Sequence, residues 1–145
     1  PAIGAGSWRT RRFESAEFDE ASRFASSIAS DGDVLVQELR PEFESPGERA
    51  IVCVDGAPMH VAVKQPRYAD DEEQVTLGSP PTEAEEALVD KVLGALPERT
   101  LYARVDVIPT DRGPMLSELE VIEPSLFFPL CQSSLDRFVR AVEQW

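Results

Sequence analysis

The sequence contains few of the residues from which several common sites are built. It has two cysteines, Cys53 and Cys131, which lie far apart without a CxxC spacing, and a single histidine, His60. Structural zinc sites take four Cys or His ligands, and disulfide frameworks are typical of small secreted chains. We therefore expect two reduced thiols and no zinc site.

Positive charge is also scarce. Lys and Arg total 14 against 27 Asp and Glu, which gives a formal net charge of −13. A duplex-binding surface needs clustered cations, so no nucleic-acid partner is expected. No apolar run approaches the roughly 18 residues of a membrane span, and no charged-then-apolar leader opens the chain, so we expect no membrane partner and a soluble, cytoplasmic protein. Only Lys64 and Lys91 are lysines.

The 145 residues suffice for one compact domain with its own core. The chain begins with Pro1, and residues 1–7, PAIGAGS, are typical of a strand and loop inside a domain. We therefore expect the chain to be a fragment or a processed protein.

Hydrophobic periodicity predicts an α+β fold. Helices are expected over 15–30, after the capping box Thr82-Glu83-Ala84-Glu85, and behind Ser133 or Ser134. Hairpins outnumber crossovers, so the sheet should be mostly antiparallel with helices packed on one face. The expected strands are Val34–Leu39, Arg49–Val54, Ala57–Lys64, a short one at Gln74–Leu77 in a solvated loop, Leu101–Pro109 and Met115–Ile122.

The last predicted hairpin collects charge on one face. A three-residue loop, Asp111-Arg112-Gly113, would place Asp106 opposite Glu118 and Arg104 opposite Glu120. Opposed carboxylates destabilise a sheet unless a cation lies between them, and oxygen-only ligands favour Mg²⁺ or Mn²⁺. The alternative interpretation is a solvated, charged face on an exposed hairpin.

The first predicted hairpin has a complementary positive face. A two-residue turn at Asp55-Gly56 pairs Val54 with Ala57, and strict alternation then puts Arg49, His60 and Lys64 on one face. This face could bind phosphate, or it could balance the negative charge of the chain.

Several segments, taken in order, resemble the ATP-grasp ligases, nearest to the branch with glutathione synthetase-like and ureidoserine-cyclising ligases. The segments are PAIGAGSWRTRRF, VLVQELRPEF, GERAIVCVDGAPMHVAVKQP, LYARVDVI and LSELEVIEPSLFF. The resemblance implies that Asp106, Glu118 and Glu120 hold the magnesium ions of Mg-ATP, and that Arg104 steadies the transferred phosphoryl group. Glu120 stands where many relatives have Asn.

The same resemblance implies the nucleotide-binding residues. Lys64 would face the phosphates and Glu48 the ribose hydroxyls. The adenine edge would lie along Gln37, Glu38 and Leu39, and the mobile loop over the triphosphate would contain Gly4, Gly6 and Ser7. Glycine loops bring backbone amides close to phosphate, although this one matches no standard phosphate-binding motif.

The implied protein is the C-terminal part of an ATP-dependent carboxylate-amine ligase that activates a carboxylate as an acyl phosphate. Residues 1–46 would be part of the small nucleotide-binding subdomain and residues 47–145 the C-terminal subdomain. Its partners would be a small-molecule carboxylate, an amine and an N-terminal portion of the same protein, without which the chain is expected to be inactive; a homo-oligomer is compatible with the sequence.

One departure supports a second hypothesis. Relatives tend to have a Phe-Arg motif after the positively charged strand, where this chain has Asp70-Asp71-Glu72-Glu73, with Arg67 as a nearby substitute. The alternative is a non-catalytic nucleotide-binding or assembly domain derived from such an enzyme.

Overall fold

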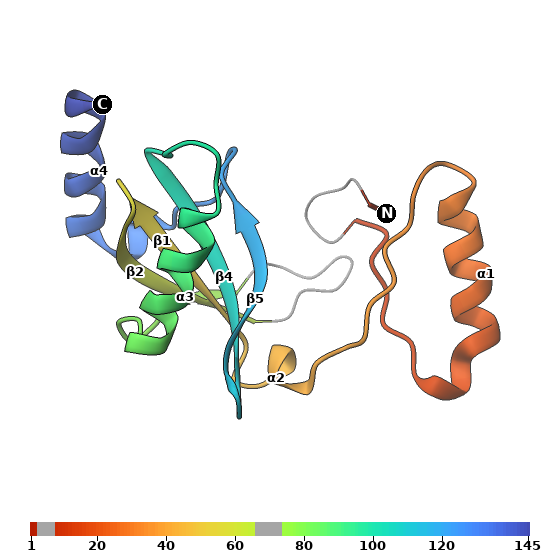
Figure 1. Ribbon diagram of the computed structural model, residues 1–145. Coiled ribbons are helices and arrows are strands. Elements are labelled where there is room, and N and C mark those ends of the chain that lie inside the picture. Colours follow the sequence, from red (N-terminus) through yellow and green to blue (C-terminus); the bar gives the residue numbers. More distant parts are fainter. Residues whose placement is uncertain (3–7, 66–73) are drawn as a thin grey trace. The chain divides into compact units, whose positions relative to one another are not determined.

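The computed structural model describes residues 1–2, 8–65 and 74–145 (Figure 1). The chain divides into two compact units, with the break after Arg40. Within the described residues, Pro1–Arg40 belongs to the first unit, and Pro41–Gln65 with Gln74–Trp145 forms the second. The division at residues 46 and 47 stays a prediction. No helix in the described ranges is long and apolar enough to cross a membrane.

The first unit contains one long helix. A 3₁₀ turn, Ser15–Glu17, leads into α1, Phe18–Ala29, which confirms the helix predicted over 15–30. The strand predicted at Val34–Leu39 is wrong, because the segment has no strand partner among the described residues. Leu35 and Val36 are 71% and 82% exposed. A segment of residues with high β propensity forms a strand only where another strand supplies hydrogen bonds.

The second unit is built on a five-stranded antiparallel sheet in the order β3-β2-β1-β4-β5 (Figure 1). This architecture confirms the α+β prediction, including the short strand after the acidic run. The strands are β1 (Glu48–Val54), β2 (Ala57–Lys64), β3 (Val75–Leu77), β4 (Tyr102–Thr110) and β5 (Gly113–Glu120), and the helices are α2 (Pro41–Glu44), α3 (Glu83–Gly94) and α4 (Gln132–Gln144).

Two bulges change the register from strict alternation. In β1–β2, Val54 pairs with Ala57 as predicted, but a bulge shifts the register between Cys53 and Val52, so that Val52 pairs with His60. Met59 is thereby left out of the pairing. This bulge moves His60 and Lys64 to the face opposite Arg49, so the prediction that all three share one face is wrong.

In β4–β5, the turn has two residues rather than three, since Thr110 pairs with Gly113. A bulge that skips Ser117 then compensates for the shorter turn. Asp106 therefore still lies opposite Glu118, and Arg104 opposite Glu120, as predicted. The predicted loop length is wrong, while the predicted pairs are confirmed.

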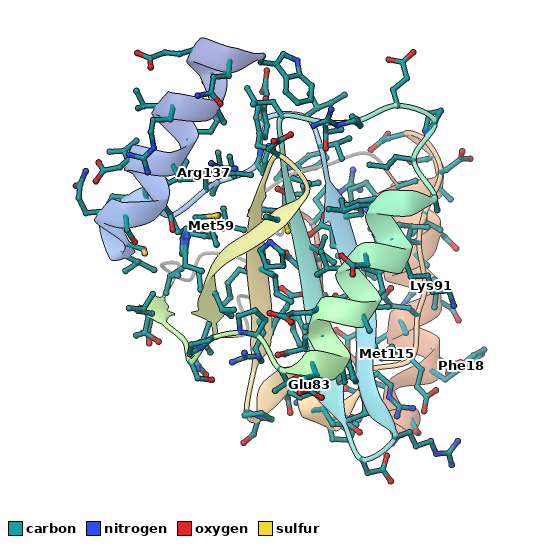
Figure 2. All side chains as sticks on the ribbon, turned by 60° about the vertical axis from the view of Figure 1, so that its left-hand side comes forward. Phe18, Met59, Glu83, Lys91, Met115 and Arg137 are labelled. Carbon is teal, nitrogen blue, oxygen red and sulfur yellow. The ribbon has the colours of Figure 1, made fainter. Side chains whose placement is uncertain are left out.

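The sheet has one apolar face and one polar face. Helix α3 covers the apolar face, where Val89 packs in the core cluster with Ile51, Val105 and Val107. Its capping box at Thr82 is confirmed. Figure 2 shows α3 and α4 on either side of the sheet.

Helix α4 contacts residues of the polar face. It begins at Gln132, earlier than predicted, and Ser134 is buried in its first turn. The Ser134 hydroxyl lies 2.8 Å from His60 Nδ1, and the Phe138 and Tyr102 rings meet at 6.0 Å. His60 is thus a buried contact of α4, and burial lowers the pKa of its imidazole.

Candidate functional site

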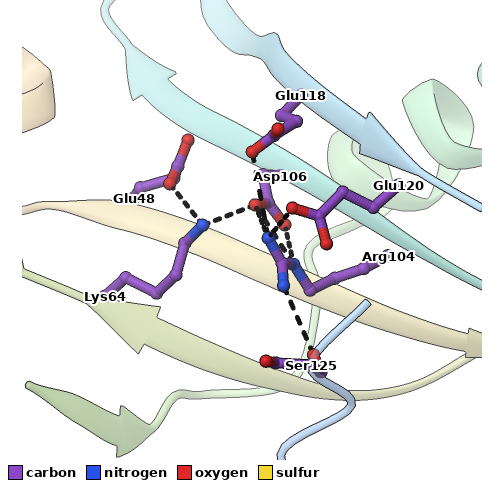
Figure 3. A network of polar contacts seen from close by, with 7 residues as sticks. All are labelled: Glu48, Lys64, Arg104, Asp106, Glu118, Glu120 and Ser125. Atoms are coloured by element: carbon purple, nitrogen blue, oxygen red, sulfur yellow. Dashed lines mark hydrogen bonds and ion pairs between the residues drawn. The ribbon is translucent and has the colours of Figure 1, made fainter. Parts of the chain in front are cut away.

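Three carboxylates converge on the polar face of β4 and β5 (Figure 3). Asp106, Glu118 and Glu120 each place a carboxylate oxygen within 4.8 Å of the other two. Asp106 is fully buried, whereas the Glu118 side chain is 54% exposed. The cluster therefore has a buried base and an open rim.

Arg104 is fixed beside these carboxylates by contacts on several sides. Its guanidinium donates to Asp106 through Nε and Nη2, both at 2.8 Å, and to Glu120 at 2.8 Å. It also donates to the Ser125 carbonyl at 3.4 Å and lies 5.6 Å from the centre of the Phe127 ring. Because these contacts hold both edges of the guanidinium, Arg104 is a positioned charge.

Lys64 joins two carboxylates that come from different strands. Its Nζ lies 2.5 Å from Asp106 Oδ2 on β4 and 2.7 Å from Glu48 Oε2 on β1. Burial by itself would lower the pKa of Lys64, but Asp106 and Glu48 outweigh it and raise that pKa. Lys64 is therefore a charged ammonium at neutral pH.

A glycine sets the approach of the strands that hold this lysine. Gly47 has φ +98°, and a Cβ there would lie 2.8 Å from the Lys64 carbonyl oxygen. A side chain at Gly47 would thus meet both backbone strain and a rigid neighbour. The residue directly precedes Glu48, so its conformation helps to bring Glu48 to Lys64.

The electrostatics of the site are unbalanced towards negative charge. Burial, and then the neighbouring Glu120 and Asp106 carboxylates, raise the pKa of Glu118. Although burial would lower the pKa of Arg104, the same carboxylates raise it, Asp106 first. Counting the described residues alone, four carboxylates face two cations here, which leaves two negative charges, the complement of one divalent ion.

The structure thus brings together six predicted residues: Glu48, Lys64, Arg104, Asp106, Glu118 and Glu120. Arg49 is not among them, because it ion-pairs on the other face with Glu85 of α3 at 2.6 Å.

The remaining predicted positions lie in the first unit or outside the described residues. Gln37, Glu38 and Leu39 are exposed residues of the first unit, in a segment without regular secondary structure. The predictions for Gly4, Gly6, Ser7, Arg67 and Asp70–Glu73 fall outside the described residues.

Two contacts of the site were not predicted from the sequence. They come from the segment after β5, where the Ser125 carbonyl and the Phe127 ring both meet Arg104. Phe127 has φ 47° in the left-handed region, which is unusual for a residue other than glycine. The segment EPSLFF is part of the resemblance to the ATP-grasp ligases, but neither periodicity nor spacing indicates that its backbone turns back to the hairpin.

Comparison with solved structures identifies the fold. D-cycloserine synthetase DcsG matches 99% of this chain and 53% of its own at TM-score 0.86 and 23% identity. D-alanine–D-alanine ligase from Bacillus anthracis, complexed with ATP, matches 86% of this chain and 44% of its own at TM-score 0.53 and 16% identity. The ATP-grasp ligase PsnB, complexed with minimal precursor, Mg and ADP, matches 94% and 44% at TM-score 0.50 and 17% identity.

No protein-family model and no curated protein matches the chain. The chain spans about half the length of the solved structures that it matches. The resemblance read from the sequence motifs is confirmed at the level of the fold, since independent backbone comparison leads to the same group of enzymes. This chain has the fold of the corresponding part of the ATP-grasp ligases.

Proposed function

We propose that this chain is the metal- and nucleotide-binding part of an ATP-dependent carboxylate-amine ligase. The observation that supports the proposal most directly is the convergence of Asp106, Glu118 and Glu120 beside the cations Lys64 and Arg104. The fold adds support, because PsnB is an ATP-grasp ligase complexed with Mg and ADP. The substrates would be a small-molecule carboxylate and an amine.

The residues present fit a magnesium or manganese ion. All three candidate ligands are carboxylates, and their oxygens are close enough for one ion to contact them together. Hard oxygen ligands suit Mg²⁺ and Mn²⁺, which usually complete their shells with water and phosphate. The excess of two negative charges in the site is the second point of fit.

In the proposed reaction, ATP phosphorylates the carboxylate, and the amine attacks the acyl phosphate to give an amide, ADP and phosphate. A bound Mg²⁺ would neutralise charge on the phosphates. Arg104 would hold the transferred phosphoryl group, since Asp106 and Glu120 orient its guanidinium from two sides. Such transfers depend on positioning and charge neutralisation, so no side-chain nucleophile is needed.

Lys64 and Glu48 would act at the nucleotide itself. The Lys64 ammonium would pair with phosphate oxygens, and the Glu48 carboxylate would accept hydrogen bonds from the ribose hydroxyls. Lys64 contacts Glu48 at 2.7 Å and also pairs with Asp106, so both groups lie beside the three candidate metal ligands. By the family resemblance, Gln37, Glu38 and Leu39 would pass along the adenine.

Calorimetric titration with ATP, with and without Mg²⁺, tests this proposal. We expect Mg²⁺ to strengthen ATP binding, and Glu118→Gln and Glu120→Gln each to reduce that gain at least about tenfold. Glu143→Gln, on the exposed part of α4, is the matched control and should bind as the unchanged protein does. Equal Mg²⁺-dependent binding in all four proteins would refute the metal assignment.

The second candidate is a nucleotide-binding domain without ligase activity. The acidic run Asp70–Glu73 favours it, because relatives tend to have an arginine there for the acceptor substrate. Measuring ADP release with candidate carboxylates and amines separates the two. Nucleotide binding without substrate-dependent ADP release would favour the non-catalytic domain.

A further inference from the structure

We propose that Lys64 competes with the divalent cation for Asp106, so that the metal binds tightly only together with a polyphosphate that draws the Lys64 ammonium away. This inference rests on the proposed function and adds that tight metal binding requires a polyphosphate in the same site. It assigns Lys64 as a positioning residue that controls access of the metal to its buried ligand.

Lys64 can reach Asp106 because a small residue, Ala50, lies on the strand between them. Lys64 lies on β2 and Asp106 on β4, with β1 between them. Ala50 of β1 pairs with both Ala62 and Asp106 and is fully buried. A side chain that ends at Cβ leaves room for the long Lys64 stem to cross β1 on the polar face (Figure 3).

The Asp106 oxygen that pairs with Lys64, Oδ2, already has three donor contacts. Asp106 Oδ1 accepts Arg104 Nε at 2.8 Å, and Oδ2 accepts Arg104 Nη2 at 2.8 Å and Lys64 Nζ at 2.5 Å. Oδ2 also lies 3.2 Å from Arg104 Nε. An ion that coordinates Asp106 through Oδ2 at about 2.1 Å must therefore displace one of these donors.

Lys64 is the donor that can move. Arg104 keeps contacts to Glu120, Ser125 and Phe127 in addition to Asp106. Among the described residues, Lys64 has one other ion-pair partner, Glu48, and its four-carbon stem rotates freely compared with a planar guanidinium. Displacement of Lys64 from Asp106 therefore costs one contact, whereas displacement of Arg104 would disrupt several.

A metal ion that arrives alone meets an unfavourable balance. It must break the Lys64–Asp106 pair and then lie close to the released ammonium, whose side chain is only 13% exposed. A polyphosphate changes this balance, because its oxygens pair with the ammonium and neutralise the repulsion. Metal and nucleotide should thus strengthen each other's binding by the same factor.

The test compares Mn²⁺ binding by the unchanged protein, Lys64→Met and Lys91→Met. Lys91 is the only other lysine and lies exposed on α3, so Lys91→Met is a matched control. Electron paramagnetic resonance measures free Mn²⁺, first without nucleotide and then with the non-hydrolysable analogue β,γ-imido-ATP. The circular dichroism spectrum of each variant reports whether it has folded.

We expect Lys64→Met to bind Mn²⁺ alone at least about tenfold more tightly than the unchanged protein. A unit charge about 6 Å from a divalent ion opposes binding by roughly that factor even at the dielectric constant of water. The gain in Mn²⁺ affinity that the analogue produces should shrink in the same variant, whereas Lys91→Met should match the unchanged protein. A merely structural role of Lys64 would weaken Mn²⁺ binding rather than strengthen it.

The outcomes separate this inference from the proposed function. If the unchanged protein binds Mn²⁺ with the analogue, but Lys64→Met does not bind Mn²⁺ alone more tightly, the competition by Lys64 is refuted. If the unchanged protein binds no Mn²⁺ even with the analogue, the proposed function itself fails. Should Lys64→Met not fold, Lys64→Gln replaces it, since Gln keeps polar contacts with both carboxylates and has the same expected result.

Discussion

Replacing Asp106 by Asn tests the electrostatic centre of the site through stability. The substitution keeps the shape of a fully buried side chain but removes its charge. It also turns an NH₂ group towards cationic donors, because both Asp106 oxygens accept bonds from Arg104 or Lys64. We expect a large loss of stability, although the two opposed carboxylates of the hairpin would suggest relief of repulsion.

The size of the stability loss depends on the ion-pair partners that Lys64 and Arg104 retain. Breaking a buried ion pair by removing one partner costs about 3–5 kcal/mol, because the remaining charge is left uncompensated. Here Lys64 retains Glu48 at 2.7 Å, and Arg104 retains Glu120 at 2.8 Å. The loss should therefore lie at the lower end, about 3 kcal/mol, which corresponds to a urea midpoint lowered by about 1.5 M at an m value of about 2 kcal/mol/M.

Urea unfolding followed by far-ultraviolet circular dichroism in the presence of EDTA measures this loss without divalent metal. Asp111→Asn, at the exposed turn of the same hairpin, is the matched control and should change stability by no more than about 0.5 kcal/mol. A loss below about 1 kcal/mol for Asp106→Asn would contradict the view that Asp106 anchors Lys64 and Arg104.

Three further predictions concern other parts of the second unit. Glu118→Gln in EDTA should stabilise the protein by about 0.5 kcal/mol at pH 7, since it removes like charge across the strands. Because the pKa of Glu118 is raised in the folded protein, ionisation of Glu118 lowers the free energy of unfolding at pH values above its usual pKa. The stabilisation by Glu118→Gln should therefore vanish as falling pH protonates Glu118. Gly47→Ala should cost about 1–3 kcal/mol in the same urea assay, from its positive φ and the Lys64 carbonyl; an unchanged midpoint would contradict this. Mass spectrometry after iodoacetamide treatment at pH 7.5 should find Cys131 labelled, because Ser133 and Ser134 lower the pKa of its thiol. Cys53 should stay unlabelled, because burial raises the pKa of its thiol to about 12. Preferential labelling of Cys53 would contradict this prediction.

The sequence by itself determined the elements whose signals are local. Three features each follow from a few adjacent residues, and the structure has all three: the capping box at Thr82, the Asp-Gly turn at residues 55 and 56, and the alternation of core and charged side chains along β4. The predicted opposition of Asp106 to Glu118 is confirmed only because two features that the sequence did not indicate, the shorter turn and the bulge, cancel.

Only the tertiary structure decided the features that depend on partners distant in the sequence. The apolar run at Val34–Leu39 looks like a strand but has no strand beside it in the described residues, since hydrogen-bonding partners are not encoded within the segment. The bulge beside Cys53 separates Arg49 from Lys64, and a bulge leaves little trace in residue type.

The same reason explains what the sequence indicated of the site and what it did not. Residue types and the two-residue period place carboxylates and an arginine on one face of a hairpin. The contact of Lys64 with Asp106 spans β1 and requires a small Ala50 between them, and the Ser125 carbonyl reaches Arg104 only after the chain turns back. Such contacts arise from the packing of whole strands, so only the folded chain determines which cation pairs with which carboxylate.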